Sequence, residues 1–314
     1  MLRDGCSGLL ASFDISDPVP VPGNNNPSVF PVIHLPGGTA EELLITCLFG
    51  ALAAAALGWS VSVAVRRRRF YPLAMYAGAA IASTAEPLID MLLHVIWPKT
   101  DMVLFTVYGR EIPPYLTFGW ILYFFPLGLW TITRTERNDF TTLRAWRGFM
   151  GILLVKAFFF ELLPIARRWW VYYGEDQPLM VYRLPMHWIF INTCAISFAA
   201  VLVFVVKRFA FGDDERYSPL LTLIYPMGLV ASYFATNAPV GTLLNGSDNL
   251  ALVTVGALAT ITLCVFTMEM CGRVVVGTTL AGSLSFLRFG MAREPLIGAV
   301  TLPTPTGSTS RRSQ

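Results

Sequence analysis

Seven apolar stretches dominate this chain, and each is close to the length of about 20 residues that an α-helix needs to cross the hydrocarbon core of a bilayer. They lie at approximately residues 43–65, 71–98, 115–133, 148–166, 186–206, 219–236 and 250–270. Only 14% of the 314 residues are charged, whereas soluble domains usually carry about 25%. The sequence therefore predicts an all-α integral membrane protein, a bundle of seven transmembrane helices that occupies residues 43–270.

Lysine and arginine are distributed unevenly between the loops that connect these stretches. The loops after the first, third, fifth and seventh stretches contain most of them: Arg66–Arg69; Arg134, Arg137, Arg144 and Arg147; Lys207, Arg208 and Arg216; and Arg273, Arg288 and Arg293. The intervening loops contain fewer: Lys99, Arg110, Arg167, Arg168 and Arg183. Because cytoplasmic loops are enriched in Lys and Arg, we expect a multi-pass protein of the cell membrane with its N-terminus outside and its C-terminus in the cytoplasm.

The two ends of the chain differ in composition from the membrane domain. Residues 1–42 are rich in Pro, Gly and Asn and are predicted to form an extracytoplasmic tail. Residues 271–314 are predicted to form a cytoplasmic tail, whose composition from about residue 295 onward is typical of a disordered segment. The net charge of +3 is small, and the basic residues lie in short loops, so we expect no nucleic-acid partner.

The second apolar stretch carries three ionisable side chains, Glu86, Asp90 and His94, at a spacing of four residues. In one continuous helix, at roughly 100° per residue, they fall within an arc of about 80°. An ionisable group near the bilayer centre is costly unless it is paired, protonated or in a wet cavity. We therefore expect this stripe to face the interior of the bundle. Pro87, directly after Glu86, is expected to kink the helix.

Other unusual polar groups are expected in the same outer half of the bundle, where several aromatic residues also lie. We therefore predict one cavity that Glu86, Asp90 and Glu161 share. The candidate catalytic residues are Glu86, Asp90 and Glu161. The candidate substrate-binding residues are His94, Arg110, Trp120, Tyr123, His187 and Asn192.

Less specific roles for these side chains remain open. A polar network that only holds helices together would also place Glu86, Asp90 and His94 inside the bundle. Lys156, in the fourth stretch, could form a salt bridge with one of the two carboxylates. The aromatic run Trp169–Tyr173 is expected to belong to the belt at the membrane surface. No metal or other cofactor is expected, because the chain has only three histidines and no Cys/His ligand spacing.

A glutamate on the second helix of an N-out, seven-helix, largely apolar protein resembles the small membrane-bound terpene cyclases of meroterpenoid pathways. The resemblance implies that acidic residues in the membrane protonate an epoxide or alkene of a prenylated substrate, and that the resulting cation cyclises. The run from Glu86 through Tyr108-Gly109-Arg110 and Ile112-Pro113 to Trp120 is more distantly similar to the carotenoid hydratases, which add water to the end of a polyene.

The chain also departs from the cyclase pattern. It is longer than those cyclases, and its seventh stretch has no deeply placed acidic residue, so Asp90 or Glu161 would have to act as the partner of Glu86. The chemistry is consistent with the composition: a carboxylic acid in an apolar site stays protonated and can act as a general acid, and aromatic faces stabilise a carbocation.

The expected function is thus a proton-initiated cyclase of an isoprenoid (a terpenoid or meroterpenoid). Its expected partners are a lipophilic substrate, the membrane lipids from which that substrate enters, and neighbouring biosynthetic enzymes. One alternative is a carotenoid-type hydratase or isomerase. Another is a proton-coupled transporter in which Glu86, Asp90 and His94 form a relay. A relay should cross the whole membrane, and the cytoplasmic half offers few ionisable groups, such as Lys156 and Glu269.

Overall fold

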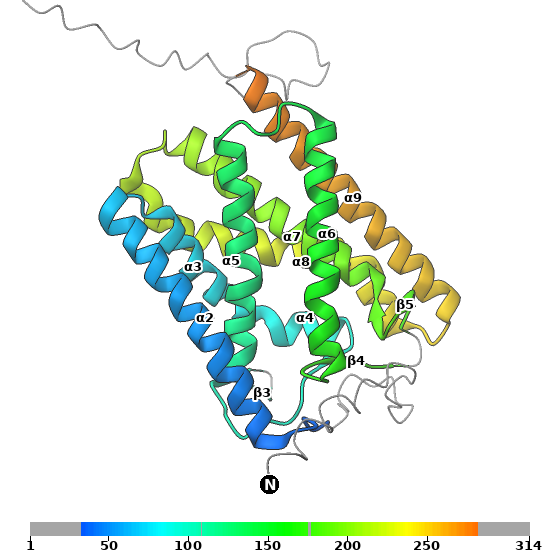
Figure 1. Ribbon diagram of the computed structural model, residues 1–314. Helices are drawn as coiled ribbons and strands as arrows, with labels where there is room; N and C mark the ends of the chain where they lie inside the picture. Colours follow the sequence, from blue (N-terminus) through cyan, green and yellow to red (C-terminus); the bar gives the residue numbers. More distant parts are fainter. Residues whose placement is uncertain (1–32, 108, 175–176, 282–314) are drawn as a thin grey trace, which may run out of the picture.

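The computed structural model describes residues 33–107, 109–174 and 177–281, and the chain is mostly helical (Figure 1). The helices are α2 (Gly38–Arg67), α3 (Tyr71–Ala82), α4 (Glu86–Leu92), α5 (Pro114–Glu136), α6 (Leu143–Ala166), α7 (Met186–Val205), α8 (Leu221–Gly246) and α9 (Leu250–Ala281). Within the described residues, six helical segments are long and apolar enough to cross a membrane. They contain α2, α5, α6, α7, α8 and α9. The chain is therefore an all-α membrane protein.

The outer limits of the helical bundle differ from those predicted. Helix α2 already begins at Gly38, and α9 continues to Ala281, so the bundle extends beyond the predicted range of 43–270 at both ends. Most of the two predicted tails, at 1–42 and 271–314, lies outside the described residues.

The second apolar stretch is not one continuous helix. A 3₁₀ turn at Ser83–Ala85 separates α3 from α4, because Pro87 has no N–H with which to continue the α-helical ladder to the Ser83 carbonyl. That carbonyl instead accepts a hydrogen bond from the Glu86 N–H. Helix α3 has 12 residues, about 18 Å at 1.5 Å per residue, whereas the hydrocarbon core is about 30 Å thick.

This break changes the predicted stripe of ionisable residues. Glu86 and Asp90 share the short helix α4, which lies crosswise to α5 and α6 in Figure 1. His94 lies beyond the last residue of α4, and its φ of 54° is left-handed. The prediction that all three side chains share one helical face is therefore wrong for His94.

Short antiparallel strand pairs gather at the end of the bundle where α4 lies (Figure 1). They pair β1 (Val95–Ile96) with β4 (Val171–Tyr172), β2 (Phe105–Val107) with β3 (Arg110–Ile112), and β5 (Met180–Val181) with β6 (Leu184–Pro185). The pairing of β1 with β4 joins the segment after α4 to the segment after α6. These strands thus hold the two parts of the chain that follow the carboxyl-bearing helices next to each other.

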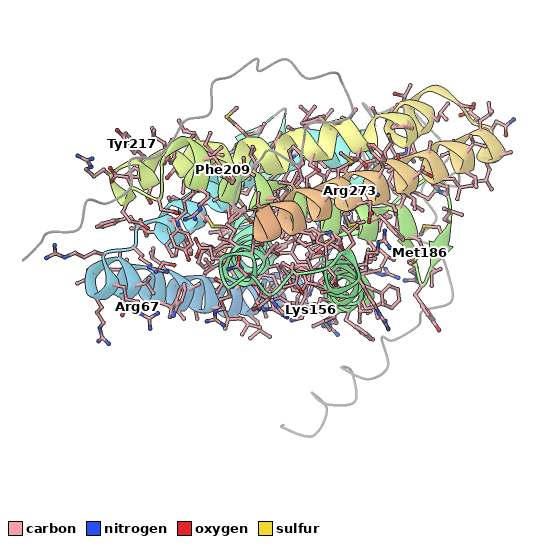
Figure 2. The ribbon with its side chains drawn as sticks, turned by 90° about the horizontal axis from the view of Figure 1, so that it is seen from above. Arg67, Lys156, Met186, Phe209, Tyr217 and Arg273 are labelled. Atoms are coloured by element: carbon pink, nitrogen blue, oxygen red, sulfur yellow. The ribbon has the colours of Figure 1, made fainter. Side chains whose placement is uncertain are left out.

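The opposite end of the bundle holds the arginine-rich connections. The ends of α2, α5 and α7 meet there around one cavity, which Thr278 of α9 also lines. Figure 2 looks along α5 and α6, with α8 and α9 running across the view, so the latter two are strongly inclined to the former. Arg67, Phe209 and Tyr217 lie on one side of that view and Met186 on the other.

Helices α7 and α8 form the centre of the bundle and pack closely against each other, while α9 packs against both and α3 packs against α8. Gly228 on α8 makes this close approach possible, because a Cβ at that position would lie 2.8 Å from Cα of Ala199 on α7. Small residues at such crossings let transmembrane helices make extensive van der Waals contact.

We predict that Gly228→Ala separates α7 from α8 and destabilises the protein by about 1–3 kcal/mol, the usual cost of overpacking. The thermal unfolding midpoint of the purified protein in detergent measures this. Gly58→Ala is the matched control, because Gly58 is also in a helix and a Cβ there meets nothing within 4 Å. Equal midpoints for the two variants would contradict the proposed tight crossing.

Candidate functional site

Three carboxyl groups line one small cavity at the end of the bundle that holds α4. Glu86 and Asp90 reach it from α4 and Glu161 from α6, and the cavity volume is about 50 Å³. Asn192 of α7 also lines it, and most of the remaining wall is aromatic: Trp120, Tyr123, Phe124, Phe160, Trp170, Trp188 and Tyr233. A space of this size holds a water-sized group.

The carboxyl group of Glu161 is buried and accepts four hydrogen bonds. Oε2 accepts from Trp170 Nε1 at 2.8 Å and from the Tyr172 hydroxyl at 3.3 Å. Oε1 accepts from Trp188 Nε1 at 3.2 Å and from Asn192 Nδ2 at 3.0 Å. An ionised carboxylate only accepts hydrogen bonds, so these four donors match Glu161 in its charged form.

A hydrogen-bond chain extends this site to α8. The Tyr233 hydroxyl donates to Oδ1 of Asn192, whose amide group donates to Glu161. Tyr233 also packs against Trp120 and Trp188, with ring centroids 5.8 Å and 6.2 Å away. The chain therefore fixes the orientation of the Asn192 amide and keeps its N–H directed at the Glu161 carboxylate.

The two carboxyls of α4 have fewer donors. Oε2 of Glu86 accepts a hydrogen bond from Nε1 of Trp120. Asp90 is 1% exposed, and neither of its carboxyl oxygens has a hydrogen-bond partner among the described residues. Since buried polar atoms are usually hydrogen-bonded, Asp90 is the most unusual polar group in the cavity wall.

Arg110 does not line the cavity but binds backbone oxygens within α4 and shortly after it. Its guanidinium group donates to the backbone oxygens of Val95 at 3.0 Å and Pro87 at 3.4 Å. It also lies 4.2 Å from the ring centroid of Trp97. Burial lowers the pKa of Arg110, and the negative charge of Asp90 acts in the opposite direction. Arg110 thus ties the β2–β3 hairpin to α4 and positions α4.

The two candidate histidines also lie outside the cavity. The His94 ring stacks on Tyr173, with centroids 5.1 Å apart, and its Nε2 lies 3.4 Å from Oδ1 of Asn245. His187 is fully buried near the start of α7, where neither ring nitrogen has a hydrogen-bond partner among the described residues. The structure therefore brings together Glu86, Asp90, Glu161, Trp120, Tyr123 and Asn192, but not His94, Arg110 or His187.

Sequence reasoning missed several residues of this wall. Trp170 and Tyr172 do not act only as a membrane-surface belt, because both donate hydrogen bonds to Glu161. Tyr233 lies in an apolar stretch where only its hydroxyl group distinguishes it from packing residues. Lys156 does not reach the carboxyls, since it is exposed on α6 with its ammonium group 5.0 Å from the ring centroid of Trp130.

No metal site accompanies the carboxyls in the described ranges, where no group of three or more His, Cys, Asp or Glu side chains could hold an ion. No family model, no curated protein and no solved structure matches this chain. A functional assignment therefore depends on the geometry of the cavity.

We predict that Glu161→Gln destabilises the protein, because the amide NH₂ replaces an acceptor in either orientation. Two of the four donors then lose their acceptor, at a cost of roughly 1–3 kcal/mol for each unsatisfied group. The thermal unfolding midpoint should fall, whereas it should not change for Glu111→Gln, which alters an exposed carboxylate on β3. An unchanged midpoint in Glu161→Gln would contradict the charged form of Glu161.

Proposed function

We propose that this protein is a membrane-embedded enzyme that protonates an isoprenoid substrate and directs the cyclisation of the resulting cation. The observation that supports this most directly is the convergence of Glu86, Asp90 and Glu161 on one aromatic cavity. Proton-initiated chemistry needs an acid, a counter-charge and a wall that excludes water, and these residues offer all three.

In this proposal the role of each carboxyl group follows from the number of hydrogen-bond donors around it. Glu161, with four donors, is the fixed negative charge that stabilises the cation. Glu86 and Asp90 lie one turn apart in α4, and two neighbouring carboxyls cannot both ionise cheaply, so they share a proton. Glu86 delivers that proton to the substrate as the general acid, and Asp90 sets which of the two carboxyls holds it. The carboxylate left behind then takes a proton from the cyclised cation, so that a C=C bond forms in the product and the acid is restored.

The aromatic side chains supply the rest of the cyclase site. Trp120 packs against Phe124 with centroids 4.4 Å apart, and Tyr233 lies beside both rings. Aromatic faces attract a cation by about 0.5–2 kcal/mol per contact. A cation formed next to Glu86 would therefore be held between the rings and the Glu161 carboxylate, away from water.

The substrate must displace side chains, because ligand pockets usually measure about 300–1,000 Å³ and the cavity is only about 50 Å³. Helices α5 and α6 make few direct contacts with each other. The rings of Tyr123 on α5 and Phe160 on α6, 4.6 Å apart, close the space between them. Phe160 is half-buried, and its rotation would open the cavity to the membrane, from which a lipophilic substrate can enter.

A hydratase is the second candidate, and the size of the cavity favours it. A space of about 50 Å³ next to three carboxyls has room and partners for a water, which could capture the cation instead of a second alkene. The identity of the product distinguishes hydration from cyclisation.

A proton-coupled transporter has less support. A relay needs ionisable groups through the bundle, yet α5 has none between Tyr123 and Arg134. On α7, Cys194 is the only ionisable side chain between His187 and Lys207.

The proposed topology has seven crossings, with α3 and α4 together forming the second. The N-terminus and the end that holds α4 face the outside of the cell membrane, and the arginine-rich end faces the cytoplasm. The positive-inside rule supports this orientation, and so does the meeting of the basic connections at one end.

We predict that an impermeant thiol reagent applied to intact cells labels Thr106→Cys, on β2, but not Arg68→Cys or Asn138→Cys. Permeabilised cells should show labelling of all three. The background carries Cys6→Ser and Cys47→Ser, because Cys47 is exposed and the cysteines at 194, 264 and 271 are buried. Labelling at position 68 or 138 in intact cells would contradict the proposed orientation and would place the arginine-rich end outside the cell.

We predict that Glu86→Gln leaves expression and the unfolding midpoint unchanged but abolishes turnover, with a loss of about 10²–10⁴-fold for a positioned acid. Asp90→Asn should also lower the rate, because the pair shares the proton. The assay incubates membranes containing the protein with a panel of prenylated epoxides and linear polyenes and identifies products by mass spectrometry.

Glu111→Gln is the matched control for this assay, because it alters an exposed carboxylate outside the cavity. Full product formation by Glu86→Gln at normal expression would show that the α4 carboxyls are structural. If the unaltered protein converts no member of the panel, the proposed function itself is wrong.

A further inference from the structure

A second and much larger cavity lies at the arginine-rich end of the bundle. Its volume is about 950 Å³, and the ends of α2, α5 and α7 form most of its wall. On α5 the lining of the carboxyl cavity ends at Phe124 and that of this cavity begins at Leu129, about 7.5 Å further along at 1.5 Å per residue, and no residue lines both. The two cavities are therefore separate sites.

The wall of this second cavity has an excess of positive charge, since six basic and three acidic residues line it. Lys207 forms ion pairs with Glu136 and Asp213, each at 2.8 Å, and Arg208 pairs with Asp213 at 2.5 Å. Glu215 accepts hydrogen bonds from the Phe70 N–H and the Ser218 hydroxyl. All three acidic side chains are therefore already engaged.

Four arginines remain: Arg67, Arg68, Arg69 and Arg137. In the part of the chain that the structure describes, none of the four forms an ion pair. They come from two places far apart in the sequence, the end of α2 with the residues that follow it and the residue directly after α5, and they line a single cavity. Guanidinium groups match phosphate oxygens in geometry and bind them through paired hydrogen bonds.

Part of the wall of the same cavity is apolar. Trp59 and Val63 of α2, Leu129 of α5 and Phe204 of α7 form this part. Figure 2 shows Arg67, from α2, and Phe209, from the segment after α7, on the same side of the molecule. A ligand that fits both parts of the wall has an anionic head and a hydrocarbon portion.

We propose that this cavity binds an amphiphile whose phosphate-bearing head has a net negative charge, with the phosphate held by Arg67, Arg68, Arg69 and Arg137 and the hydrocarbon portion against Trp59 and Leu129. Basic pockets between transmembrane helices are known to bind anionic lipid head groups on the cytoplasmic side. The phosphate can belong to a membrane phospholipid or to a soluble phosphate compound. This site does not depend on the carboxyl cavity or on its proposed chemistry.

The test uses the full chain purified in a non-ionic detergent, with bound molecules counted by native mass spectrometry. The probes are phosphatidylglycerol, phosphatidylcholine with the same acyl chains, and inorganic pyrophosphate. Arg67→Gln/Arg137→Gln should weaken phosphatidylglycerol binding about tenfold or more, given the contribution of each basic residue near a lipid head group. Arg68→Gln/Arg69→Gln is a second pair from the same wall and should act in the same direction.

The matched control is Arg66→Gln/Arg144→Gln, which removes the same charge from exposed arginines at the same end that do not line the cavity. It should bind phosphatidylglycerol as the unaltered protein does. If pyrophosphate displaces phosphatidylglycerol, the site recognises the phosphate group alone. If phosphatidylglycerol binds and pyrophosphate does not displace it, the ligand is a membrane lipid. The proposal would be overturned if phosphatidylglycerol and phosphatidylcholine bind equally and pyrophosphate does not bind. It would also be overturned if the test and control variants lose phosphatidylglycerol binding to the same extent.

Discussion

The burial of the Glu161 carboxylate is the constraint on which this end of the bundle depends. A charged group inside a membrane-spanning helix needs donors, and its own helix cannot supply them, because the backbone N–H groups are engaged in the helical ladder. The four donors come from two other parts of the chain: Trp170 and Tyr172 from the segment after α6, and Trp188 and Asn192 from α7. One side chain thus fixes the positions of α6, α7 and the connection between them.

The α4 side of the cavity is positioned by the helix break at Pro87 and by the hydrogen bonds of Arg110. Pro87 ends the α-helical ladder of α3, and the chain then turns so that α4 presents Glu86 and Asp90 opposite Glu161. Arg110 holds the new direction by binding backbone oxygens on either side of Asp90, at Pro87 and Val95. A helix that continued straight through residues 71–98 would have carried its carboxyls along the bundle axis instead.

The sequence allowed six of the seven membrane segments and the meeting of Glu86, Asp90 and Glu161 to be predicted, because both follow from the cost of polar groups in an apolar solvent, whereas the second predicted segment is broken at Pro87. The free-energy cost of exposing an ionisable group to lipid turns each such side chain toward the interior of the bundle, whatever the detailed packing of the helices. The position of His94 was not predictable in the same way, since it depends on where α4 ends. The donors at Trp170 and Tyr172 were missed because an aromatic run near a helix end has the same composition at the membrane surface and in the interior.

The space between α5 and α6 is closed by side chains, with Tyr123 against Phe160 and Trp130 against both Phe149 and the Lys156 ammonium group. Side-chain rotations at exposed positions take picoseconds to nanoseconds, whereas movements of whole helices take microseconds or longer. Exchange between the cavity and the lipid phase by rotation of the half-buried Phe160 ring would therefore need no rearrangement of the bundle. The order and lateral pressure of the surrounding acyl chains, which restrict such rotations, would then control that exchange more than any hinge in the protein.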